Sequence, residues 1–502
     1  MPIDPRTPVI VGVGQVVNRP IVADLTTRTQ PVALMVEALR LAGLDATRRV
    51  EERSALLEQL DELTAIPSFV WRAHDPARAV AEGLGIHVAR TRVAFAGGTA
   101  PQTLLFDAAR RIAVGDLEVA AVVGGEAIRS RDLARKHHEP VEWFEQGEDV
   151  AAANVVGEVP DALTDHERAV GLTVPVHTYA LLEHARRHAH GLTRADHLDQ
   201  LGRLAARMSE VAASNERAWI RDGRSAESVT TPASDNRMVS FPYTKLLTSN
   251  VIVDMGAAVI VCSLEAARAA RVPDDQMVFP QIGAHAKEQW FVSERLELSR
   301  SIAMHACARG VLGEGAGRAD GIALFDIYSC FPAVVQMAGD ALGIDLWGDP
   351  RPPSVTGGMT FFGGPGNNYV THSIATMVER LRAVPGATGL VTALGWYCST
   401  HAWGTYASAP PVGGFRAVDV QAAVDAEPLR VADDSYAGTG EVESYTVTHD
   451  RDGRAARAIV SVRTPAGARR LVGSDDADVA AEVEAADPLG ATVAVDGHAI
   501  TL

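Results

Sequence analysis

The chain has 502 residues and a formal net charge of −17. At roughly 150 residues per domain, this length predicts about three domains. Hydrophobic residues make up 47% of the sequence and charged residues 22%, which is ordinary for a globular protein. The strong negative charge argues against nucleic acid or an anionic membrane as the main partner, and solubility alone is a sufficient reason for it.

Cysteine usage and the N-terminal segment both bear on the cellular location. The four cysteines, Cys262, Cys307, Cys330 and Cys398, are widely spaced and form no Cys-x-x-Cys pair. This fits a reducing compartment and predicts neither a disulfide framework nor a zinc site. We expect no secretory signal, because no basic stretch precedes a long apolar run. No run of about 18 apolar residues suggests a membrane span, so a cytoplasmic protein is expected.

The first 127 residues alternate between predicted strands and helices, which is typical of an α/β protein with parallel strands. Pro8–Gly14 is a β-branched run that ends in glycines and predicts a buried strand. Gln30–Ala42 has apolar residues at helical spacing, and Glu62–Phe69 predicts a second strand. Arg92–Ala127 then has the pattern of a strand, a glycine-rich turn, an amphipathic helix and an apolar strand.

The middle of the chain predicts an insertion, followed by a second half that repeats the first. Residues 128 to about 244 are more charged and mostly helical in pattern, whereas Asn250–Ala270 returns to a strand and a helix. A second series starts near Met277 with a strand, a helix at Ser301–Leu312 and another strand. It ends in Ser354–Ser399, a second strand–turn–helix–strand unit. A duplication this deep predicts two halves that each direct a helix N-terminus at a shared crevice.

The C-terminal part of the chain differs in character. Ser408–Gly414 is rich in proline and glycine and predicts a linker. Ser444–Val462 alternates apolar and polar residues across an Asp-Arg-Asp-Gly turn, as β-hairpins do. The last 90 residues or so predict a small β-rich domain, such as a five-stranded barrel. The expected boundaries are 1–127 with 245–272 for the first half, 128–244 for the insertion, 273–407 for the second half and 415–502 for the β-rich domain.

The glycine-rich turns are candidate binding elements. Gly97 and Gly98 lie between a predicted strand and a helix. Backbone N–H groups at a helix start bind oxyanions or phosphates, but a tight turn also needs glycine for structural reasons alone. Gly364 lies in the second turn, where Asn367 is a candidate amide donor to a carbonyl oxygen. A flexible connection explains that second turn at least as well.

Two cysteines are candidate nucleophiles. Cys330 follows Tyr328 at the end of a predicted strand, where ligands of open α/β sheets usually bind. A buried thiol that acts as a small apolar residue is the more common case. Cys398 and His401 follow the last predicted strand of the second half and could pair as thiol and base. A packed thiol beside a loop histidine remains the alternative.

The sequence gives little support for a metal or a permanently bound cofactor. Gly12 and Gly14 superficially resemble a dinucleotide-binding loop, but the third glycine is replaced by Val17. His184 and His188 lie four residues apart on one predicted helix face without a third ligand. A solvated helix face is therefore the better interpretation of these histidines, and no metal site is predicted.

These motifs resemble the thiolase superfamily, in particular the sterol-carrier-protein-type thiolases and the thiolase-like proteins related to them. The similarity spans about residues 7–405 and includes GDLEVAAVVGGEA at 115–127, TKLLTSNVIVDMGAAVIV at 244–261, YSCF at 328–331 and GGMTFFGGPG at 357–366. The resemblance implies a duplicated five-layer α-β-α-β-α core with a helical loop-domain insertion. The C-terminal tail resembles an OB-type barrel.

The resemblance also implies which positions should carry the chemistry, and this chain differs at them. The turn that holds the family's nucleophilic cysteine contains Gly97 and Gly98 here. The histidine of the GHP motif matches Gly364, and the residue that opens the HDCF or NEAF motif matches Tyr328. Cys398 corresponds only approximately to the family's second cysteine. These replacements argue against Claisen condensation through a covalent acyl-enzyme.

The ligand implied by the resemblance is CoA or an acyl-CoA, as a substrate or ligand and not as a permanently bound cofactor. The family binds the nucleotide end of CoA largely through its inserted domain and through segments that correspond to Lys245–Asn250. Lys245 and Ser249 are therefore expected binding residues, together with Gly97, Gly98 and Gly364, and an ordinary surface lysine is the alternative for Lys245. A homodimer is expected from the family, with a monomer as the alternative.

Three functions stay open at this point. The first is a nominal acetyl-CoA acyltransferase of lipid or sterol metabolism, which would rely on Cys330 or Cys398. The second is a non-catalytic carrier or scaffold that binds acyl-CoA. The third is thioester hydrolysis or hydration that uses Tyr328, Asn367 or His401.

Overall fold

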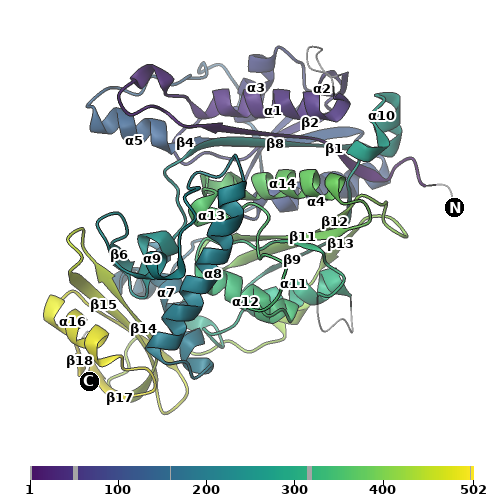
Figure 1. Ribbon diagram of the computed structural model, residues 1–502. Helices are drawn as coiled ribbons and strands as arrows, with labels where there is room; N and C mark the ends of the chain where they lie inside the picture. The colour runs from purple at the N-terminus through teal and green to yellow at the C-terminus, as the bar shows by residue number, and fades with distance from the viewer. Residues whose placement is uncertain (1–2, 49–54, 159, 314–318, 498, 502) are drawn as a thin grey trace.

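The protein has five layers, arranged α-β-α-β-α, with a smaller β-rich part at one end (Figure 1). The computed structural model describes residues 3–48, 55–158, 160–313, 319–497 and 499–501. Helices α4 (Ala100–Val114) and α14 (Tyr369–Ala383) lie between two mixed sheets, and further helices cover the outer faces. The predicted duplicated core is confirmed. Across the described ranges, no helix combines the length and apolar character that crossing a bilayer requires.

The first sheet has the strand order β1-β8-β4-β2-β3-β5. Strand β8 runs antiparallel to both β1 and β4, whereas β4, β2, β3 and β5 run parallel. The strands of the first 127 residues, β1 to β4, therefore all run in one direction, as predicted, and β8 is the antiparallel strand that returns between β1 and β4 after the long insertion. Its elements are β1 (Pro8–Asn18), α1 (Pro31–Thr47), α2 (Ala55–Glu58), β2 (Glu62–Ala65), α3 (Pro76–Leu84), β3 (Arg90–Ala94), β4 (Val119–Ala127), β5 (Asn154–Val156), β8 (Asp254–Ser263) and α10 (Leu264–Ala269).

Helix α1 packs closely on β1 because two glycines of the strand leave room for it. A Cβ atom at Gly12 would overlap the carbonyl oxygen of Ala42, and one at Gly14 would overlap that of Ala38. A larger residue at either position would push the helix off the sheet. Packing therefore explains this glycine pair without a dinucleotide.

The second sheet has the strand order β10-β11-β12-β9-β13. β12 is antiparallel to β11 and β9, so the chain continues past the predicted last strand into a hairpin. Residues 396–399 are the turn of this hairpin, and His401 lies on a strand instead of a loop. The elements of this half are η3 (Asp274–Gln276), β9 (Phe279–Lys287), η4 (Val292–Glu294), α11 (Ile302–Leu312), β10 (Leu324–Asp326), α12 (Pro332–Leu342), η5 (Gly366–Asn368), β11 (Thr388–Gly395), β12 (Thr400–Ala407) and β13 (Arg416–Asp419).

The second repeat unit lacks its predicted first strand. The residues after Ser354 form a buried loop and the short helix α13 (Gly358–Phe361). The Ser354 hydroxyl accepts hydrogen bonds from the N–H groups of Gly357 and Gly358 at 3.0 and 3.1 Å, and the Asp326 carboxylate accepts two more from this loop. Gly357 and Gly358 have φ values of 106° and 78°, in the left-handed region that a strand does not contain.

The insertion within the first half is mostly helical, as predicted, but its strands join two different sheets. Strand β5 extends the first sheet, whereas β6 pairs with β14 near the C-terminus. His184, expected on a solvated face, is buried and its Nδ1 lies 2.6 Å from the Tyr445 carbonyl oxygen. The elements are α5 (Ile128–Lys136), α6 (Asp165–Ala169), α7 (Pro175–Ala189), α8 (Arg194–Ser214), α9 (Ala226–Thr230), β6 (Met238–Ser240), β7 (Tyr243–Thr244) and η2 (Lys245–Leu247).

The C-terminal residues form a small antiparallel sheet with one helix against it (Figure 1). The predicted hairpin is present as β14 and β15. The path β16-β15-β14-β17-β18 is open in the described residues, so the OB-type barrel is not confirmed. The elements are α15 (Gln421–Asp425), β14 (Gly438–His449), β15 (Ala455–Arg463), β16 (Arg469–Ser474), α16 (Ala477–Ala486), β17 (Thr492–Asp496) and β18 (Ala499–Thr501).

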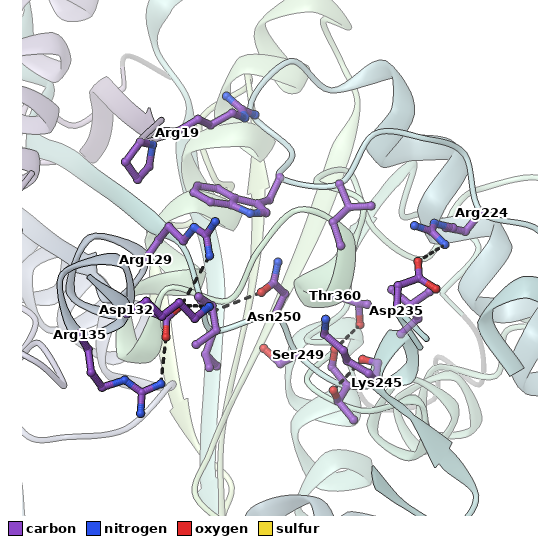
Figure 2. Close-up of a pocket in the computed structure, with 18 of the residues that line it drawn as sticks. Arg19, Arg129, Asp132, Arg135, Arg224, Asp235, Lys245, Ser249, Asn250 and Thr360 are labelled. Atoms are coloured by element: carbon purple, nitrogen blue, oxygen red, sulfur yellow. Dashed lines mark hydrogen bonds and ion pairs between the residues drawn. The ribbon is translucent and has the colours of Figure 1, made fainter. Parts of the chain in front are cut away.

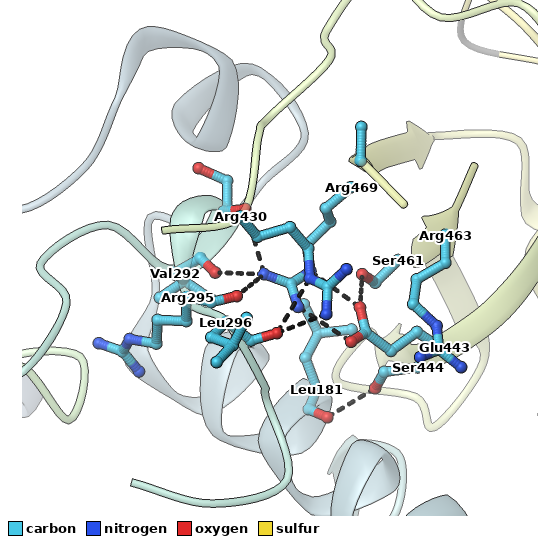
Figure 3. A network of polar contacts seen from close by, with 12 residues as sticks. Leu181, Val292, Arg295, Leu296, Arg430, Glu443, Ser444, Ser461, Arg463 and Arg469 are labelled. Atoms are coloured by element: carbon cyan, nitrogen blue, oxygen red, sulfur yellow. Dashed lines mark hydrogen bonds and ion pairs between the residues drawn. The ribbon is translucent and has the colours of Figure 1, made fainter. Parts of the chain in front are cut away.

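Arg469 forms a buried ion pair with Glu443 inside this C-terminal sheet and also links the sheet to the second half (Figure 3). The Arg469 guanidinium donates to both carboxylate oxygens of Glu443, at 2.8 and 2.9 Å. It also donates to the carbonyl oxygens of Ser293 and Arg295, at 3.1 and 2.5 Å. Burial raises the pKa of Glu443, but the hydrogen bonds from Arg469 more than offset this, so the pKa lies below its usual value. The guanidinium therefore ties the domain to the segment around η4.

Candidate functional site

A basic pocket of about 770 Å³ opens where the first half, the insertion and the C-terminal sheet meet (Figure 2). Seven basic residues line it against two acidic ones. In a chain with a net charge of −17, this concentration of positive charge favours an anionic ligand. The basic residues are Arg19, Arg129, Arg135, Lys136, Arg224, Lys245 and Arg451, and the acidic ones are Asp132 and Asp235.

Helix α5 supplies one wall of the pocket, where a single carboxylate is shared by three cations. Asp132 lies 3.5 Å from Arg129, 3.1 Å from Arg135 and 2.7 Å from Lys136. Burial raises the pKa of Asp132, but hydrogen bonds from Lys136 and Arg135 more than offset this, so the pKa lies below its usual value. The carboxylate is therefore ionised at neutral pH, and the wall still carries a net positive charge.

The opposite wall contains Lys245, which the sequence singled out. Lys245 is exposed and forms no salt bridge with any residue that the structure describes. Nearby, Arg224 pairs with Asp235 at 3.1 Å, and Arg19 donates to the carbonyl oxygen of Ala218 at 2.7 Å. Lys245 is thus a cation that an anionic ligand can engage without breaking an existing pair.

The inner end of the pocket is formed by Ser249, which touches two of the predicted motifs. Its backbone N–H donates to the carbonyl oxygen of Cys330 at 3.0 Å. The neighbouring Asn250 accepts a hydrogen bond from the N–H of Gly364 at 2.9 Å. The Ser249 hydroxyl is buried and has no hydrogen-bond partner among the described residues. The structure therefore brings Lys245, Ser249, Cys330 and Gly364 to one side of the fold.

Gly364, in the second glycine-rich turn, has no free space beside it. A Cβ atom there would overlap the Ser249 hydroxyl oxygen and lie 3.2 Å from the Met359 Cε atom. A histidine at this position would need Ser249 to move first. The side chains of Ser249 and Met359 therefore pack directly against the glycine.

The same is true at Gly98, in the first glycine-rich turn. A Cβ atom at Gly98 would lie 2.5 Å from the Tyr328 hydroxyl and would overlap the carbonyl oxygen of Leu394. Tyr328 is buried, and its N–H donates to the Thr392 hydroxyl at 2.8 Å. Burial raises the pKa of Tyr328 above its usual value, so the phenol is neutral at physiological pH. Its hydroxyl fills the space that a cysteine side chain would occupy.

Each half packs the start of its inner helix against the other half, as the duplication predicts. Gly98 precedes α4 and meets Leu394 of the second half. In return, Asn368 precedes α14, and its amide oxygen fills the space beside Gly124 of the first half. Gly97 lies beside Trp396, since a Cβ atom placed on Gly97 would be 3.4 Å from the indole nitrogen of Trp396. Atoms of the second half thus fill the space beside Gly98 and Gly124.

Cys398 and His401 do come together, but neither is in the form that nucleophilic catalysis needs. Sγ of Cys398 lies 3.9 Å from Nε2 of His401. Burial raises the pKa of Cys398 to about 12 and lowers that of His401 to about 4. Both groups are therefore neutral near pH 7, so the thiolate is scarce.

The turn that carries Cys398 is held in an unusual conformation. Trp396 and Cys398 have φ values of 59° and 62°, in the left-handed region that non-glycine residues rarely adopt. The Tyr179 hydroxyl donates to the Trp396 carbonyl at 2.8 Å and accepts from the Cys398 N–H at 2.9 Å. Arg295 donates to the Tyr397 carbonyl at 2.7 Å. Sequence reasoning missed Tyr179 and Arg295, because no local motif marks them.

Asn367 and Cys330 are the remaining candidates from the sequence. The Asn367 amide donates to the carbonyl oxygen of Pro67 at 3.0 Å and so fixes the loop after β2. Its neighbour Asn368 has a buried amide nitrogen without a partner in the described part of the chain. Burial raises the pKa of Cys330 above its usual value, which disfavours a thiolate there as well.

Comparisons with known proteins agree with this architecture. Residues 419–498 match the family described as the thiolase-like protein type 1 additional C-terminal domain. A crystal structure of a monomeric SCP2-thiolase-like protein type 1 from Mycobacterium smegmatis is 30% identical and has a TM-score of 0.81, with 99% of each chain covered. The chain belongs to the SCP2-thiolase-like proteins of type 1. No curated protein matches this thiolase-like protein in sequence.

More distant solved structures share the fold alone. The dimeric peroxisomal thiolase of Saccharomyces cerevisiae is 15% identical with a TM-score of 0.54, over 81% of this chain and 98% of that one. A thiolase from Ascaris suum in complex with coenzyme A is 14% identical with a TM-score of 0.55, over 80% and 99%. These thiolases leave about a fifth of this thiolase-like protein uncovered, in line with its additional domain.

Proposed function

We propose that this thiolase-like protein binds CoA thioesters non-covalently. The phosphate groups would lie in the basic pocket, and the thioester end would point toward Ser249 and Gly364. The observation that carries the proposal is the concentration of seven basic side chains around one pocket of a strongly acidic chain. A volume of about 770 Å³ also falls within the usual range of small-molecule sites.

The residues of the pocket suit the successive parts of such a ligand. Lys245 and the cations of α5 would meet phosphates, for which charge-assisted hydrogen bonds are strong. The unpartnered Ser249 hydroxyl would serve an amide or carbonyl group of the pantetheine arm. No step of this binding requires a nucleophile.

A binding role is favoured over acyl transfer because the reactive positions are filled or neutral. Gly98 cannot attack a thioester, and the Tyr328 hydroxyl takes the space beside it. Acyl transfer through Cys398 is the second candidate, favoured by its 3.9 Å approach to His401. It would require His401 to accept the thiol proton, and the lowered pKa of this histidine opposes that step. Lipid or sterol metabolism and a cytoplasmic location belong to the same proposal.

Calorimetric titration of the purified protein with CoA, acetyl-CoA and a longer acyl-CoA tests the binding role. We expect saturable binding that weakens with salt and with Lys245→Ala, and no thiolysis. Absence of binding to all three ligands would overturn the proposal. Turnover that disappears in Cys398→Ser but persists in Cys330→Ser would instead support the acyltransferase.

A further inference from the structure

The hairpin turn of the additional C-terminal domain reaches the basic pocket. Arg451 lies at this turn, between β14 and β15, and lines the pocket although about 200 residues separate it from Lys245. The match to the additional C-terminal domain includes this residue. Thiolases that leave about a fifth of this chain uncovered share the fold of the core. The pocket therefore draws one of its cations from the part of the chain that distinguishes this family.

The hairpin is fixed to the same segment that positions Lys245. Thr448 of β14 pairs with Ser240 of β6, and the N–H of Phe241 donates to the Val447 carbonyl at 2.8 Å. The Ser240 hydroxyl lies 2.8 Å from that of Thr446. This segment continues through β7 directly into Lys245. The two cations are thus supported by one continuous set of contacts.

The backbone of the turn is itself well defined. The Asp450 carboxylate accepts hydrogen bonds from the N–H groups of Asp452 and Arg454, at 2.8 and 2.9 Å. Gly453 has a φ value of 81°, which suits glycine in a tight hairpin turn. The acidic side chain of Asp450 is engaged with the turn, and Arg451 remains exposed. A fixed backbone reduces the entropy lost when the arginine binds a ligand.

We propose that Arg451 contacts a phosphate group of the bound CoA, so that the C-terminal domain is a wall of the binding site. This inference rests on the proposed function and adds a specificity residue to it. A guanidinium forms two parallel hydrogen bonds with phosphate oxygens, whereas the ammonium group of a lysine binds phosphate as a single point charge. The contacted phosphate is either the 3′-phosphate of the ribose or part of the pyrophosphate. Binding of CoA analogues with and without the 3′-phosphate distinguishes the two.

The test compares Arg451→Ala with Arg454→Ala, which removes the same charge from the same turn at a residue that does not line the pocket. Both positions are exposed, so both variants should unfold at the wild-type temperature. We expect Arg451→Ala to weaken CoA binding about 3- to 10-fold and to reduce its salt dependence, as loss of one phosphate contact does. Arg454→Ala should bind CoA as the wild type does.

Dephospho-CoA identifies the phosphate. If Arg451→Ala and the wild type bind this ligand equally, the contact is to the 3′-phosphate. If the difference persists, the contact is to the pyrophosphate, and either result supports the inference. The inference would be overturned if Arg451→Ala bound CoA as tightly as the wild type, or if Arg454→Ala lost as much affinity as Arg451→Ala. Weaker binding by Lys245→Ala would still support the proposed function in that case. Wild-type protein that binds no CoA would overturn the proposed function together with this inference.

Discussion

The hydroxyl of Tyr328 lies 2.5 Å from the point where a Cβ atom at Gly98 would stand. These residues come from different halves of the duplicated core, and the resemblance to thiolases predicted catalytic positions at both. The residue at one position is therefore physically linked to the residue at the other. The absence of a side chain at Gly98 leaves room for the Tyr328 hydroxyl, so this site is packed instead of empty.

Gly98→Ala should destabilise the protein by about 1–3 kcal/mol, the usual range for overpacking a dense core. Tyr328→Phe should recover only part of this loss, because the Leu394 carbonyl oxygen would still overlap the new methyl group. Urea unfolding of the single and double variants measures the coupling. Gly321→Ala is the matched control, since nothing lies within 4 Å of a Cβ atom there. Wild-type stability of Gly98→Ala would contradict the packing described.

The four thiols should be unreactive in the native protein. All of them are buried and free, and burial raises the pKa of Cys398 to about 12. At pH 8 only about one Cys398 in 10⁴ would be a thiolate. We expect a colorimetric thiol reagent to label none rapidly at pH 8 and all four after unfolding. Rapid labelling of one native thiol that is lost in Cys398→Ser would argue for an activated nucleophile.

Arg469→Met should destabilise the protein by about 3–5 kcal/mol, because it leaves the buried Glu443 carboxylate without its partner. The double variant Arg469→Met with Glu443→Gln should lose less stability than Arg469→Met alone. Since the pKa of Glu443 is lowered in the folded state, its stabilising contribution exists above its unfolded pKa and disappears as the pH falls through the folded value. Thermal unfolding across pH measures both effects.

Arg463→Met provides the comparison for that prediction. Its ion pair with Glu441 at 2.8 Å is exposed, with 40% and 46% of the two side chains accessible. Such surface pairs contribute at most about 1 kcal/mol. Similar losses in Arg463→Met and Arg469→Met would contradict the role assigned to the buried pair.

Because the carboxyl group of Glu126 is buried, we expect the stability of the protein to fall as the pH rises. Burial raises its pKa from 4.5 to about 7, despite hydrogen bonds from Phe69 and Ser68. Between these values the folded state holds a proton that the unfolded state has released, so stability decreases by at most about 3 kcal/mol. Glu126→Gln should remove this dependence and be the more stable protein at pH 8. Glu82→Gln, at an exposed position, should leave it unchanged.

The protein should be a monomer in solution. Strand β5 pairs with β3, from Arg92–Asn154 to Ala94–Val156, and so makes the edge of the first sheet a strand of only three residues. An edge strand this short offers few free hydrogen-bonding groups to a second copy. Light scattering coupled to gel filtration should give a mass near 53 kDa. A mass twice as large would favour the dimer expected from other thiolases.

The sequence predicted local features well, because helical and strand periodicity are properties of neighbouring residues. It placed the helix at Gln30–Ala42, the hairpin within Ser444–Val462 and the duplicated order of elements. It failed at Ser354, where side-chain hydrogen bonds to the backbone and left-handed glycines replace a strand. It also missed β12 after Cys398, because the apolar pattern of the hairpin does not reveal where its turn lies.

The sequence by itself determined that this chain has a duplicated α/β core and that Gly98 and Gly364 stand in its two glycine-rich turns. Only the tertiary structure decided what fills those positions, since Tyr328 and Ser249 reach them across the fold. It also decided the binding site, which gathers cations from Arg19 to Arg451 into one pocket. Charge attraction acts through space, and only the folded path of the chain brings such distant residues within reach of one ligand.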